Sequence, residues 1–307
     1  MTSTDAPKAS VIIPTYNGGA LFHRVLCAVQ AQHTSWPFEI IVVDSESDDG
    51  TAEFAKSKNV VVHSIPKREF QHGRTRNLGV GMAAGEYAAL LTQDALPADN
   101  LWLQNLVTVM DKYPRAAGAF GRHVAYPDAS PFLARDIANH FASFDAYPLA
   151  VSKYTSFRRW TSGDIGWRQM VHYFSDNNAC LRRAAWKKIP YPHVDYGEDQ
   201  AWAARVIEAG FEKLYVKSAV VYHSHEYSPD EMFERSRIEG HFFKKYFGYD
   251  IAPAEDPLDK HIAGLNAKDE KWAAQKGIDD KWLALQRALN EAKIRGLWKG
   301  MRSASQL

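Results

Sequence analysis

The sequence predicts an α/β protein in which an open, doubly wound and mostly parallel sheet is followed by a helical extension. Apolar runs of strand length alternate with segments of helical periodicity through residue 121, and this alternation is typical of strands paired in parallel through right-handed crossovers. Two of these runs end on an acidic residue, Asp44 and Asp94. An open sheet presents such strand-end side chains to a ligand along its carboxyl edge.

Each element follows from its apolar spacing and from the residues that end it. Pro14 ends the hydrogen bonding of the first strand, and Gly85 ends the helix before the central strand. Strands are predicted at residues 10–14, 39–44, 60–62, 86–94 and 117–121, and helices at residues 21–29, beyond residue 51, at 75–84 and at 101–113.

The second half of the chain is less regular. Residues 127–172 mix aromatic and polar side chains without a clean period, which predicts irregular helix and loop. Regular structure resumes at residues 178–189, and further elements are predicted as a helix at 199–210, one or two strands at 213–222 and a helix at 229–247. After Pro253 the composition shifts toward Lys, Asp, Ala and Trp, and residues 279–298 are predicted to form an amphipathic helix with a basic end.

Composition and charge limit the kind of partner. The 307 residues are 46% hydrophobic and 24% charged with a net charge of +1, which is ordinary for a folded protein and provides no overall field to gather nucleic acid. Cys27 and Cys180 are too few for a disulfide framework or a cysteine metal site, which favours a reducing compartment. The polar first ten residues and the lack of a long apolar run predict a cytoplasmic protein.

Several motifs in order resemble one enzyme family. Residues 11–17 (VIIPTYN), 42–45 (VVDS) with 49–51 (DGT), the strand-end Asp94, and the pair Glu198 and Asp199 together resemble the family-two inverting glycosyltransferases of GT-A fold, over roughly residues 10–245. Within that family, residues 70–77 (FQHGRTRN), 91–95 (LTQDA) and 221–228 (VYHSHEYS) are similar to the bacterial rhamnosyltransferase branch. That branch typically uses dTDP-rhamnose to build surface polysaccharides.

The resemblance implies a division of the chain. A GT-A, Rossmann-like domain is expected over residues 1–250, with a nucleotide-sugar-binding half at about 10–122 and an acceptor and catalytic half at about 123–250. Residues 251–307 are expected to form a C-terminal helical extension.

The implied function is the inverting transfer of a sugar, L-rhamnose from dTDP-rhamnose, to a saccharide or lipid-linked saccharide in O-antigen or other surface polysaccharide synthesis. One alternative is the same machinery with a UDP-hexose such as UDP-glucose or UDP-galactose. Another is a nucleotide- or glycan-binding protein without turnover, against which the presence of both Asp94 and Asp199 argues. A dinucleotide-dependent oxidoreductase fits poorly, because the first strand leads into TYNGG and not into a G-x-G-x-x-G turn.

The resemblance assigns donor-binding roles to residues near the first strand ends. Asp44 at a strand end suits the N3–H of a pyrimidine base or the hydroxyls of a ribose, and Pro14 and Tyr16 lie at the neighbouring strand end. A local alternative is that Asp44 caps a turn. The resemblance places Arg76 near the donor, and its planar donor fork suits phosphate. It is equally compatible with a solvated position at the start of a helix.

The same resemblance predicts a divalent cation, Mg²⁺ or Mn²⁺, which prefers oxygen ligands and bridges the diphosphate of the donor. Many relatives carry two acids separated by one residue, whereas residues 92–95 are TQDA, so Gln93 and Asp94 face the donor with one acid. A histidine is expected to complete the site. His223 and His225 lie on one face of an extended segment, and His223 is preferred. The alternatives are that Asp94 only opens a turn and that the histidines pack or lie at the surface.

Asp199 is the predicted catalytic base, because inverting transfer needs one carboxylate to take the proton of the acceptor hydroxyl. The local alternative is an acid stabilised by the dipole of a helix N-terminus. Asp176, Asn177 and Asn178 are expected to line the junction of donor and acceptor, with Glu198 as a further acceptor-side neighbour. A turn explains residues 176–178 almost as well.

The expected partners are the nucleotide-sugar donor and the saccharide acceptor, and no nucleic acid. The basic end of the last helix carries Lys293, Arg295, Lys299 and Arg302 beside Trp298. Such a helix is suited to peripheral contact with the inner face of an anionic cell membrane, where lipid-linked acceptors reside. It is also suited to packing on the core or to a dimer contact.

Overall fold

The computed structural model describes residues 6–251 and 257–304. Their packing forms two compact units: the residues up to Val124 with Ala138–His223, and Ala125–Ile137 with the residues from Ser224 onward. The functional division predicted at residue 250 stays a prediction. The packing divides the chain elsewhere, because the helix at residues 229–247 packs against the last helix of the chain.

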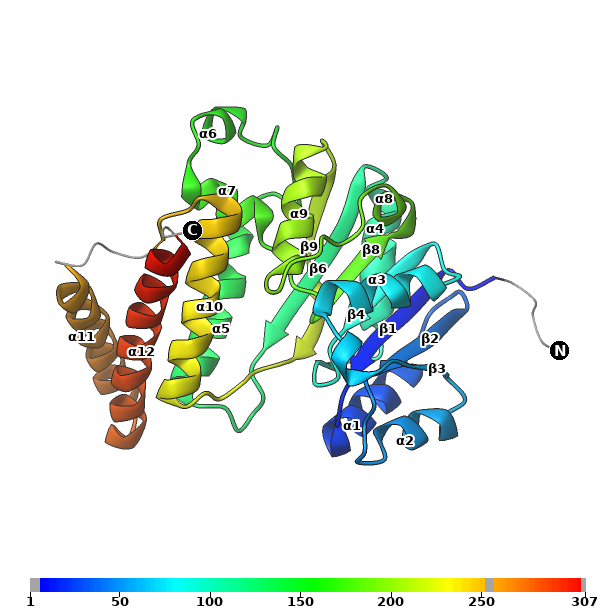
Figure 1. Ribbon diagram of the computed structural model, residues 1–307, viewed down its shortest axis with the longest axis horizontal. Helices are drawn as coiled ribbons and strands as arrows, with labels where there is room; N and C mark the ends of the chain where they lie inside the picture. Colours follow the sequence, from blue (N-terminus) through cyan, green and yellow to red (C-terminus); the bar gives the residue numbers. More distant parts are fainter. Residues whose placement is uncertain (1–5, 252–256, 305–307) are drawn as a thin grey trace. The chain divides into compact units, whose positions relative to one another are not determined.

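The first unit is built on one sheet with the strand order β3-β2-β1-β4-β8-β6-β9-β5, and β7 pairs with β9 (Figure 1). The strands are β1 (Ala9–Thr15), β2 (Phe38–Asp44), β3 (Val61–Ser64), β4 (Tyr87–Leu91), β5 (Leu96–Pro97), β6 (Ala116–Val124), β7 (Ala150–Val151), β8 (Asn178–Arg182) and β9 (Glu212–Tyr222). The pairs β1–β2, β1–β4, β2–β3 and β6–β9 are parallel. The predicted mostly parallel α/β sheet is confirmed.

The sheet contains strand reversals that the sequence analysis did not predict. Strand β8 runs antiparallel to both of its neighbours, β4 and β6, and the short strands β5 and β7 run antiparallel to β9. The sequence analysis predicted a mostly parallel sheet but not which strands are reversed, because β8 follows a run of short helices on the irregular segment.

The helices, in chain order, are α1 (Gly19–Gln30), α2 (Thr51–Ser57), α3 (His72–Met82), α4 (Trp102–Lys112), α5 (Pro131–Ser143), α6 (Phe157–Thr161), α7 (Ile165–His172), α8 (Arg183–Lys188), α9 (Glu198–Glu208), α10 (Pro229–Phe247), α11 (Leu258–Lys276) and α12 (Asp280–Ala304). Short 3-10 turns lie at Lys67–Glu69 and Phe144–Ala146. Most predicted helices are present to within a few residues at their ends, whereas α11 was not predicted.

The core of the first unit explains the apolar runs in the sequence. Strand β4 is buried along its whole length, because helices cover the sheet. Phe22 and Leu26 of α1 and Trp102 and Leu106 of α4 are fully buried and belong to the same apolar cluster as the strands. This packed sheet positions the loops that precede and follow its strands.

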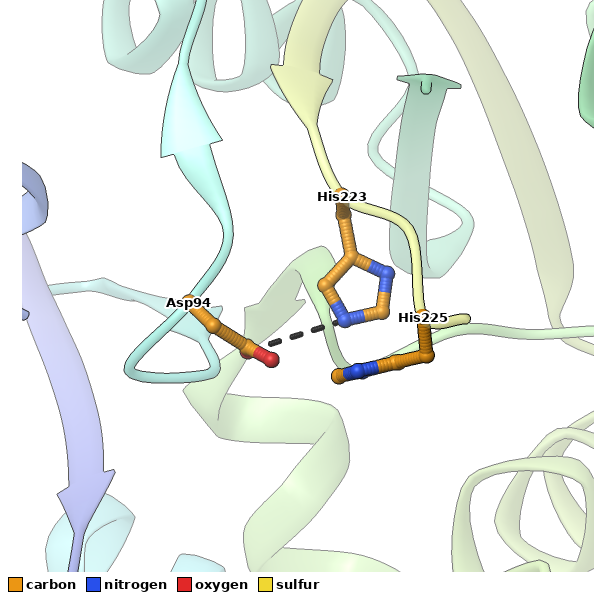
Figure 2. Close-up of side chains that lie close together, drawn as sticks. All are labelled: Asp94, His223 and His225. Atoms are coloured by element: carbon orange, nitrogen blue, oxygen red, sulfur yellow. Dashed lines mark ion pairs between the residues drawn. The ribbon is translucent and has the colours of Figure 1, made fainter. Parts of the chain in front are cut away.

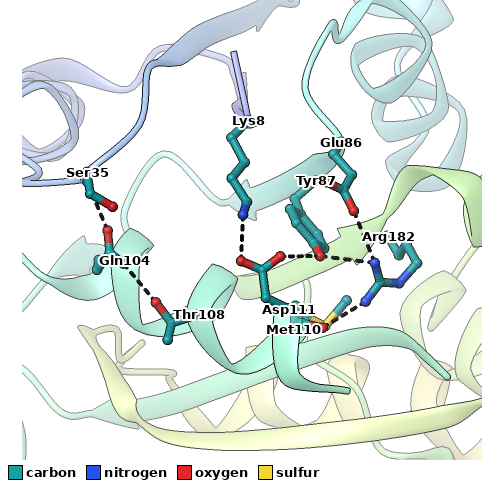
Figure 3. A network of polar contacts seen from close by, with 9 residues as sticks. All are labelled: Lys8, Ser35, Glu86, Tyr87, Gln104, Thr108, Met110, Asp111 and Arg182. Atoms are coloured by element: carbon teal, nitrogen blue, oxygen red, sulfur yellow. Dashed lines mark hydrogen bonds and ion pairs between the residues drawn. The ribbon is translucent and has the colours of Figure 1, made fainter. Parts of the chain in front are cut away.

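A polar network pins the edge of the sheet where β4 begins and β8 ends (Figure 3). Asp111 of α4 accepts hydrogen bonds from Lys8 and from the Tyr87 hydroxyl, the latter at 2.8 Å. Arg182 donates to the Tyr87 hydroxyl at 3.0 Å and to the Met110 carbonyl at 2.7 Å. Helix α4 is therefore fastened at this amino edge of β4, and the opposite edge is left to the functional loops.

The second unit is helical, and its helices pack very closely. Helix α10 begins with a capping box of Ser228 and Glu231 and ends at Gly248 in the left-handed conformation. A Cβ on Gly240 of α10 would collide with the backbone of α12, and one on Gly300 of α12 would collide with the backbone of α10. The two helices therefore approach backbone to backbone at these glycines.

The apolar face of helix α12 is buried in the packing of the second unit. Ile294 and Leu297 are buried, and Trp298 packs against the cluster formed by α11 and α12. Of the alternatives weighed for this helix, packing within the unit describes its apolar side chains, and the contact with a membrane stays a prediction. Along residues 6–251 and 257–304, no helix has both the length and the apolar composition needed to cross a bilayer.

Candidate active site

The carboxyl edge of the sheet brings together strand ends that are distant in sequence. Leu91 at the end of β4 pairs with Asn178 at the start of β8, because β8 is reversed. Val124 at the end of β6 pairs with Tyr222 at the end of β9. The first residue of β8 therefore lies at the same edge as the last residues of β1, β2, β4, β6 and β9. Most of the predicted site residues follow these strand ends or precede β8.

Asp44 ends β2 and is held tightly by its own surroundings. Its Oδ1 accepts hydrogen bonds from Thr15 Oγ1 at 3.1 Å and Ser47 Oγ at 2.6 Å, and its Oδ2 accepts from the Ser47 N–H at 3.0 Å. The side chain is 2% exposed. The turn-capping alternative is thus real, and the predicted contact with a base or ribose stays a prediction.

Tyr16 and Gln93 tie the loop after β1 to the loop after β4. The Tyr16 N–H donates to Gln93 Oε1 at 2.9 Å, and Gln93 Nε2 donates back to the Tyr16 carbonyl at 3.1 Å. The Tyr16 ring remains exposed, and Lys67 Nζ lies 4.2 Å from its centroid while donating to its hydroxyl at 2.6 Å. Pro14 is half-buried within β1, opposite Val43. The two predicted donor-binding loops are therefore joined through the Gln93 side chain, and the ammonium group of Lys67 lies on the Tyr16 ring.

Asp94 and His223 lie together, as the sequence predicted for a cation site. Asp94 follows β4, and its Oδ1 is 3.6 Å from Nε2 of His223, which directly follows β9 (Figure 2). The His223 side chain is buried, its backbone N–H donates to the Val124 carbonyl at 2.9 Å, and its ring packs at 5.4 Å against His123. His225 is tied to His223 by a single intervening residue, so the chain keeps it close.

A second group of acids surrounds Arg76. The Arg76 side chain is 3% exposed, its Nη1 donates to Glu198 Oε1, and its Nε lies 3.4 Å from Asp176 Oδ2. Asp176 also accepts a 2.6 Å hydrogen bond from the Tyr191 hydroxyl. The Asp176 N–H donates in turn to Asp199 Oδ2 at 3.4 Å. Asp176, Glu198 and Asp199 therefore form one cluster with Arg76, which we call the acid cluster.

The acid cluster has one guanidinium for three carboxyl groups, and its pKa values reflect this. Burial raises the pKa of Asp199 well above the ordinary aspartate range, and the charges of Glu198 and Asp176 raise it further, against the opposing charge of Arg76. Burial raises the pKa of Asp176 to about 7, although Arg76 lowers it. Carboxyl groups with raised pKa values are stronger proton acceptors, which suits a general base.

The structure distributes the remaining predicted residues unevenly. Asn178 is completely buried, and its amide contacts only the protein: Oδ1 accepts from Trp102 Nε1 at 2.8 Å, and Nδ2 donates to the carbonyls of Arg122 and Ala219 at 3.1 and 2.9 Å. Asn177 is half-buried beside it. Arg76 lies within the acid cluster, so its guanidinium is already engaged by carboxylates.

The sequence analysis missed two residues that contact the predicted site residues, Lys67 and Tyr191. Lys67 follows β3 and reaches Tyr16, and its place after a strand was a usable signal. Tyr191 lies between two prolines in an irregular segment, where no periodicity pointed to a buried hydroxyl at Asp176. Both depend on tertiary contacts between residues far apart in the chain.

The arrangement of this unit defines a glycosyltransferase of the GT-A type: a mostly parallel α/β sheet in which β8 is reversed between β4 and β6, with acids gathered at its carboxyl edge. The model of glycosyl transferase family 2 matches residues 10–189. The chain belongs to this family, and the predicted resemblance is confirmed.

Relatives with assigned activities include two bacterial enzymes. The O-antigen chain rhamnosyltransferase RfbN of Salmonella typhimurium is 36% identical over 233 residues, which cover 74% of this chain and 70% of RfbN. The O-antigen chain rhamnosyltransferase WbaN of Salmonella anatum is 31% identical and covers 75% of this chain and 70% of WbaN. Among solved structures, the mannosyltransferase PcManGT from Pyrobaculum calidifontis, in complex with GDP-Man and Mn²⁺, superposes with a TM-score of 0.63 at 19% identity, over 96% of this chain and 88% of that one. This last similarity concerns the fold alone.

Proposed function

We propose that the protein is an inverting rhamnosyltransferase that moves L-rhamnose from dTDP-rhamnose to a saccharide or lipid-linked saccharide acceptor in bacterial surface polysaccharide synthesis. The observation that carries the choice of sugar is the similarity to RfbN and WbaN, both O-antigen chain rhamnosyltransferases, at 36% and 31% identity over about three quarters of the chain. The acid cluster carries the reaction type, because it supplies a carboxylate suited to one proton transfer.

The proposed reaction is a single displacement at the anomeric carbon of the donor. The acceptor oxygen forms a bond to that carbon, the bond from the carbon to the diphosphate oxygen breaks, and the nucleoside diphosphate leaves with the electron pair. Asp199 takes the proton of the acceptor hydroxyl. Its raised pKa makes it a better proton acceptor than an ordinary aspartate, once it is ionised.

Neighbouring backbone N–H groups position this base. The N–H of Asp176 and the N–H of Gln200 donate to the two carboxylate oxygens of Asp199, at 3.4 and 2.7 Å. Arg76 and Tyr191 hold Asp176 from the other side. We assign the acceptor side to Asp176, Asn177 and Glu198, and we leave Asn178 out because its amide is used by the protein.

On the donor side, we assign the base and ribose of the nucleotide to Asp44 and Tyr16, with Pro14 in the supporting strand. Gln93 fixes the backbone of Tyr16 against the loop that carries Asp94. Lys67 holds the exposed Tyr16 ring from above. A pyrimidine base stacked on such a held ring would lose little ring entropy on binding.

The pair Asp94 and His223 fits a divalent cation. Their ligand atoms lie 3.6 Å apart, and two ligands about 2.1 Å from one ion stand roughly 3 to 4 Å from each other. A carboxylate with an imidazole favours Mn²⁺ over Mg²⁺. Bound there, the cation would neutralise charge that develops on the departing diphosphate. PcManGT, which was solved with Mn²⁺, supports the same expectation.

The deciding experiment measures nucleoside diphosphate release from dTDP-rhamnose, UDP-glucose and UDP-galactose at equal concentrations. Rhamnose transfer predicts clear preference for dTDP-rhamnose. A preference for a UDP-hexose would instead support the second candidate, a UDP-hexose transferase of the same fold. Binding of every donor without turnover would support a binding protein.

The cation is tested separately. Chelation should abolish turnover, and Mn²⁺ alone should raise the melting temperature of the wild type but not of Asp94→Asn or His223→Ala. His193→Ala, at an exposed position, is the matched control. Full turnover in excess chelator would remove the cation from the proposal without touching the choice of donor.

A further inference from the structure

The segment that contains α6 exposes aromatic side chains on the surface of the first unit. Tyr154 and Phe157 are each 58% exposed, the highest fractions among the exposed large hydrophobic residues. Their rings stack with centroids 6.4 Å apart and planes 17° apart. In Figure 1, α6 projects beyond α7 at the end of this unit. Two large rings are therefore presented side by side without cover in the described chain.

The same segment is basic. Residues 149–168 hold four basic residues and one acidic residue, Asp164. That acid is already paired, because Arg159 Nε lies 2.8 Å from its Oδ2. Arg158 is exposed, and its side chain has no hydrogen bond or ion pair within residues 6–251 and 257–304. Lys153 lies 5.5 Å from the Tyr154 ring centroid, but its Nζ is engaged elsewhere, because it donates to the Glu208 carbonyl at 2.6 Å and lies 3.9 Å from Glu208 Oε1. We call Tyr154, Phe157 and Arg158 the α6 patch.

The α6 patch rests on a fixed base. Trp167 and Val171 of α7 pack with Val151 and with Ile207 of α9 in a small apolar cluster. Arg159 lies over the Trp167 ring at 5.0 Å, and Asp164 caps α7 by accepting from the Trp167 N–H at 2.9 Å. The segment that carries the two rings is therefore held in place by packed side chains, and its backbone does not need to rearrange when it binds a partner.

We propose that the α6 patch binds the headgroup region of an anionic lipid bilayer. Aromatic rings beside an exposed Arg are suited to such an interface, where the rings enter the headgroup layer and the guanidinium meets lipid charge. A second copy of the same patch would bring positive charge against positive charge. The inference does not depend on the identity of the donor sugar.

This site differs from the C-terminal helix as a membrane contact. Leu297 and Ile294 of α12 are buried in helix packing, whereas Tyr154 and Phe157 are exposed. The two sites therefore make opposite predictions for the same binding assay.

The test is co-sedimentation of the whole protein with vesicles of phosphatidylcholine alone and of phosphatidylcholine mixed with phosphatidylglycerol. The wild type should bind only the anionic vesicles, and raised salt should release it. Arg158→Glu changes the local charge by two and should weaken binding about thirtyfold, and the pair Tyr154→Ser with Phe157→Ser should weaken it about tenfold. Arg24→Glu and Leu101→Ser, also exposed in the first unit, are the matched controls and should bind normally.

Four outcomes would overturn the proposal: no binding by the wild type, equal binding to neutral vesicles, full binding by the α6 variants, or equal losses in the controls. Loss of binding only on Lys299→Glu with Arg302→Glu would transfer the contact to α12. A wild type that dimerises through this face, and becomes monomeric in the Tyr154 and Phe157 variant without any lipid effect, would replace the bilayer with a second copy. Unchanged circular dichroism and melting temperature establish that each variant is folded.

Discussion

The acids at the carboxyl edge of the sheet fall into two groups that are held in opposite ways. Asp44, which we assign to the donor side, receives three hydrogen bonds from Thr15 and Ser47, which belong to its own and the adjacent strand ends. Asp199, which we assign to the acceptor side, has two other carboxyl groups as neighbours and shares one guanidinium with them.

This difference agrees with the proposed roles, a ligand-binding carboxylate at Asp44 and a reactive one at Asp199. A carboxylate whose oxygens accept several hydrogen bonds is held in a fixed position, which suits an anchor for a ligand. A carboxyl group in an acidic and buried cluster is destabilised when ionised, so it gains by taking a proton. We therefore expect variants near Asp199 to change turnover, and variants near Asp44 and Tyr16 to change the KM for the donor.

The largest effect is expected for Asp199→Asn. If Asp199 is the base, turnover should fall about a thousandfold, because general base catalysis contributes roughly two to four orders of magnitude. Donor affinity, measured by calorimetry with dTDP-rhamnose, should stay unchanged. Asp195→Asn, exposed and four residues earlier, is the control. Near-normal turnover in Asp199→Asn would show that Asp199 is not the catalytic base.

The next effect concerns stability. Arg76→Met should lower the free energy of unfolding by about 3 kcal/mol, because it leaves buried carboxyl groups without their cation. Arg74→Met, on the same helix but exposed, should change it by less than about 0.5 kcal/mol. Urea denaturation measures both. Similar values for the two variants would show that Arg76 does not hold the acid cluster together.

The pH dependence of stability gives a smaller effect. The pKa of Asp199 is raised in the folded state from 3.8, so its contribution favours the folded state at low pH and is lost as pH rises and the group ionises. Asp199→Asn avoids this loss. The variant should therefore melt a few degrees above the wild type at pH 8. The gap should narrow toward pH 5, and a gap that widened there would contradict the direction of the shift.

The smallest effect lies on the donor side. Lys67→Met removes the cation that holds the Tyr16 ring, and it should raise the KM for the donor about fivefold while kcat stays nearly constant. Lys58→Met removes a similar cation over the Phe54 ring, 5.1 Å from its centroid, and serves as the control. A fall in kcat with unchanged KM would contradict a role of Lys67 in donor binding.

Local patterns were enough to predict much of the fold. The strands that end at Thr15, Asp44 and Leu91 are continuous apolar runs, and α10 begins at a proline after a serine cap, so each carries its own signal. The reversed strand β8 carries no such signal, because strand direction depends on the path of the preceding segment. Helix α11 was missed because its exposed positions are rich in alanine and lysine and its apolar residues are sparse.

The site shows the same limit. The strand ends alone were enough to predict that Asp44 and Asp94 share one edge of the sheet, because parallel strands end together. The position of Arg76 could not be predicted in this way. The residues around it, HGRTRN, are typical of a polar helix start, and its burial depends on Glu198 and Asp176, more than 90 positions away.

Asn178 shows how closely one side chain can be specified by the fold. Its amide nitrogen faces two carbonyl oxygens, of Arg122 and Ala219, where the ladder between β6 and β9 is irregular, and a Cβ on Gly121 would collide with that amide. Aspartate has nearly the same size and shape, yet it would turn an acceptor toward both carbonyls. Replacement by its closest chemical copy would therefore leave three oxygens facing one another in the interior. The two hydrogen atoms of this amide let a polar residue begin the reversed strand.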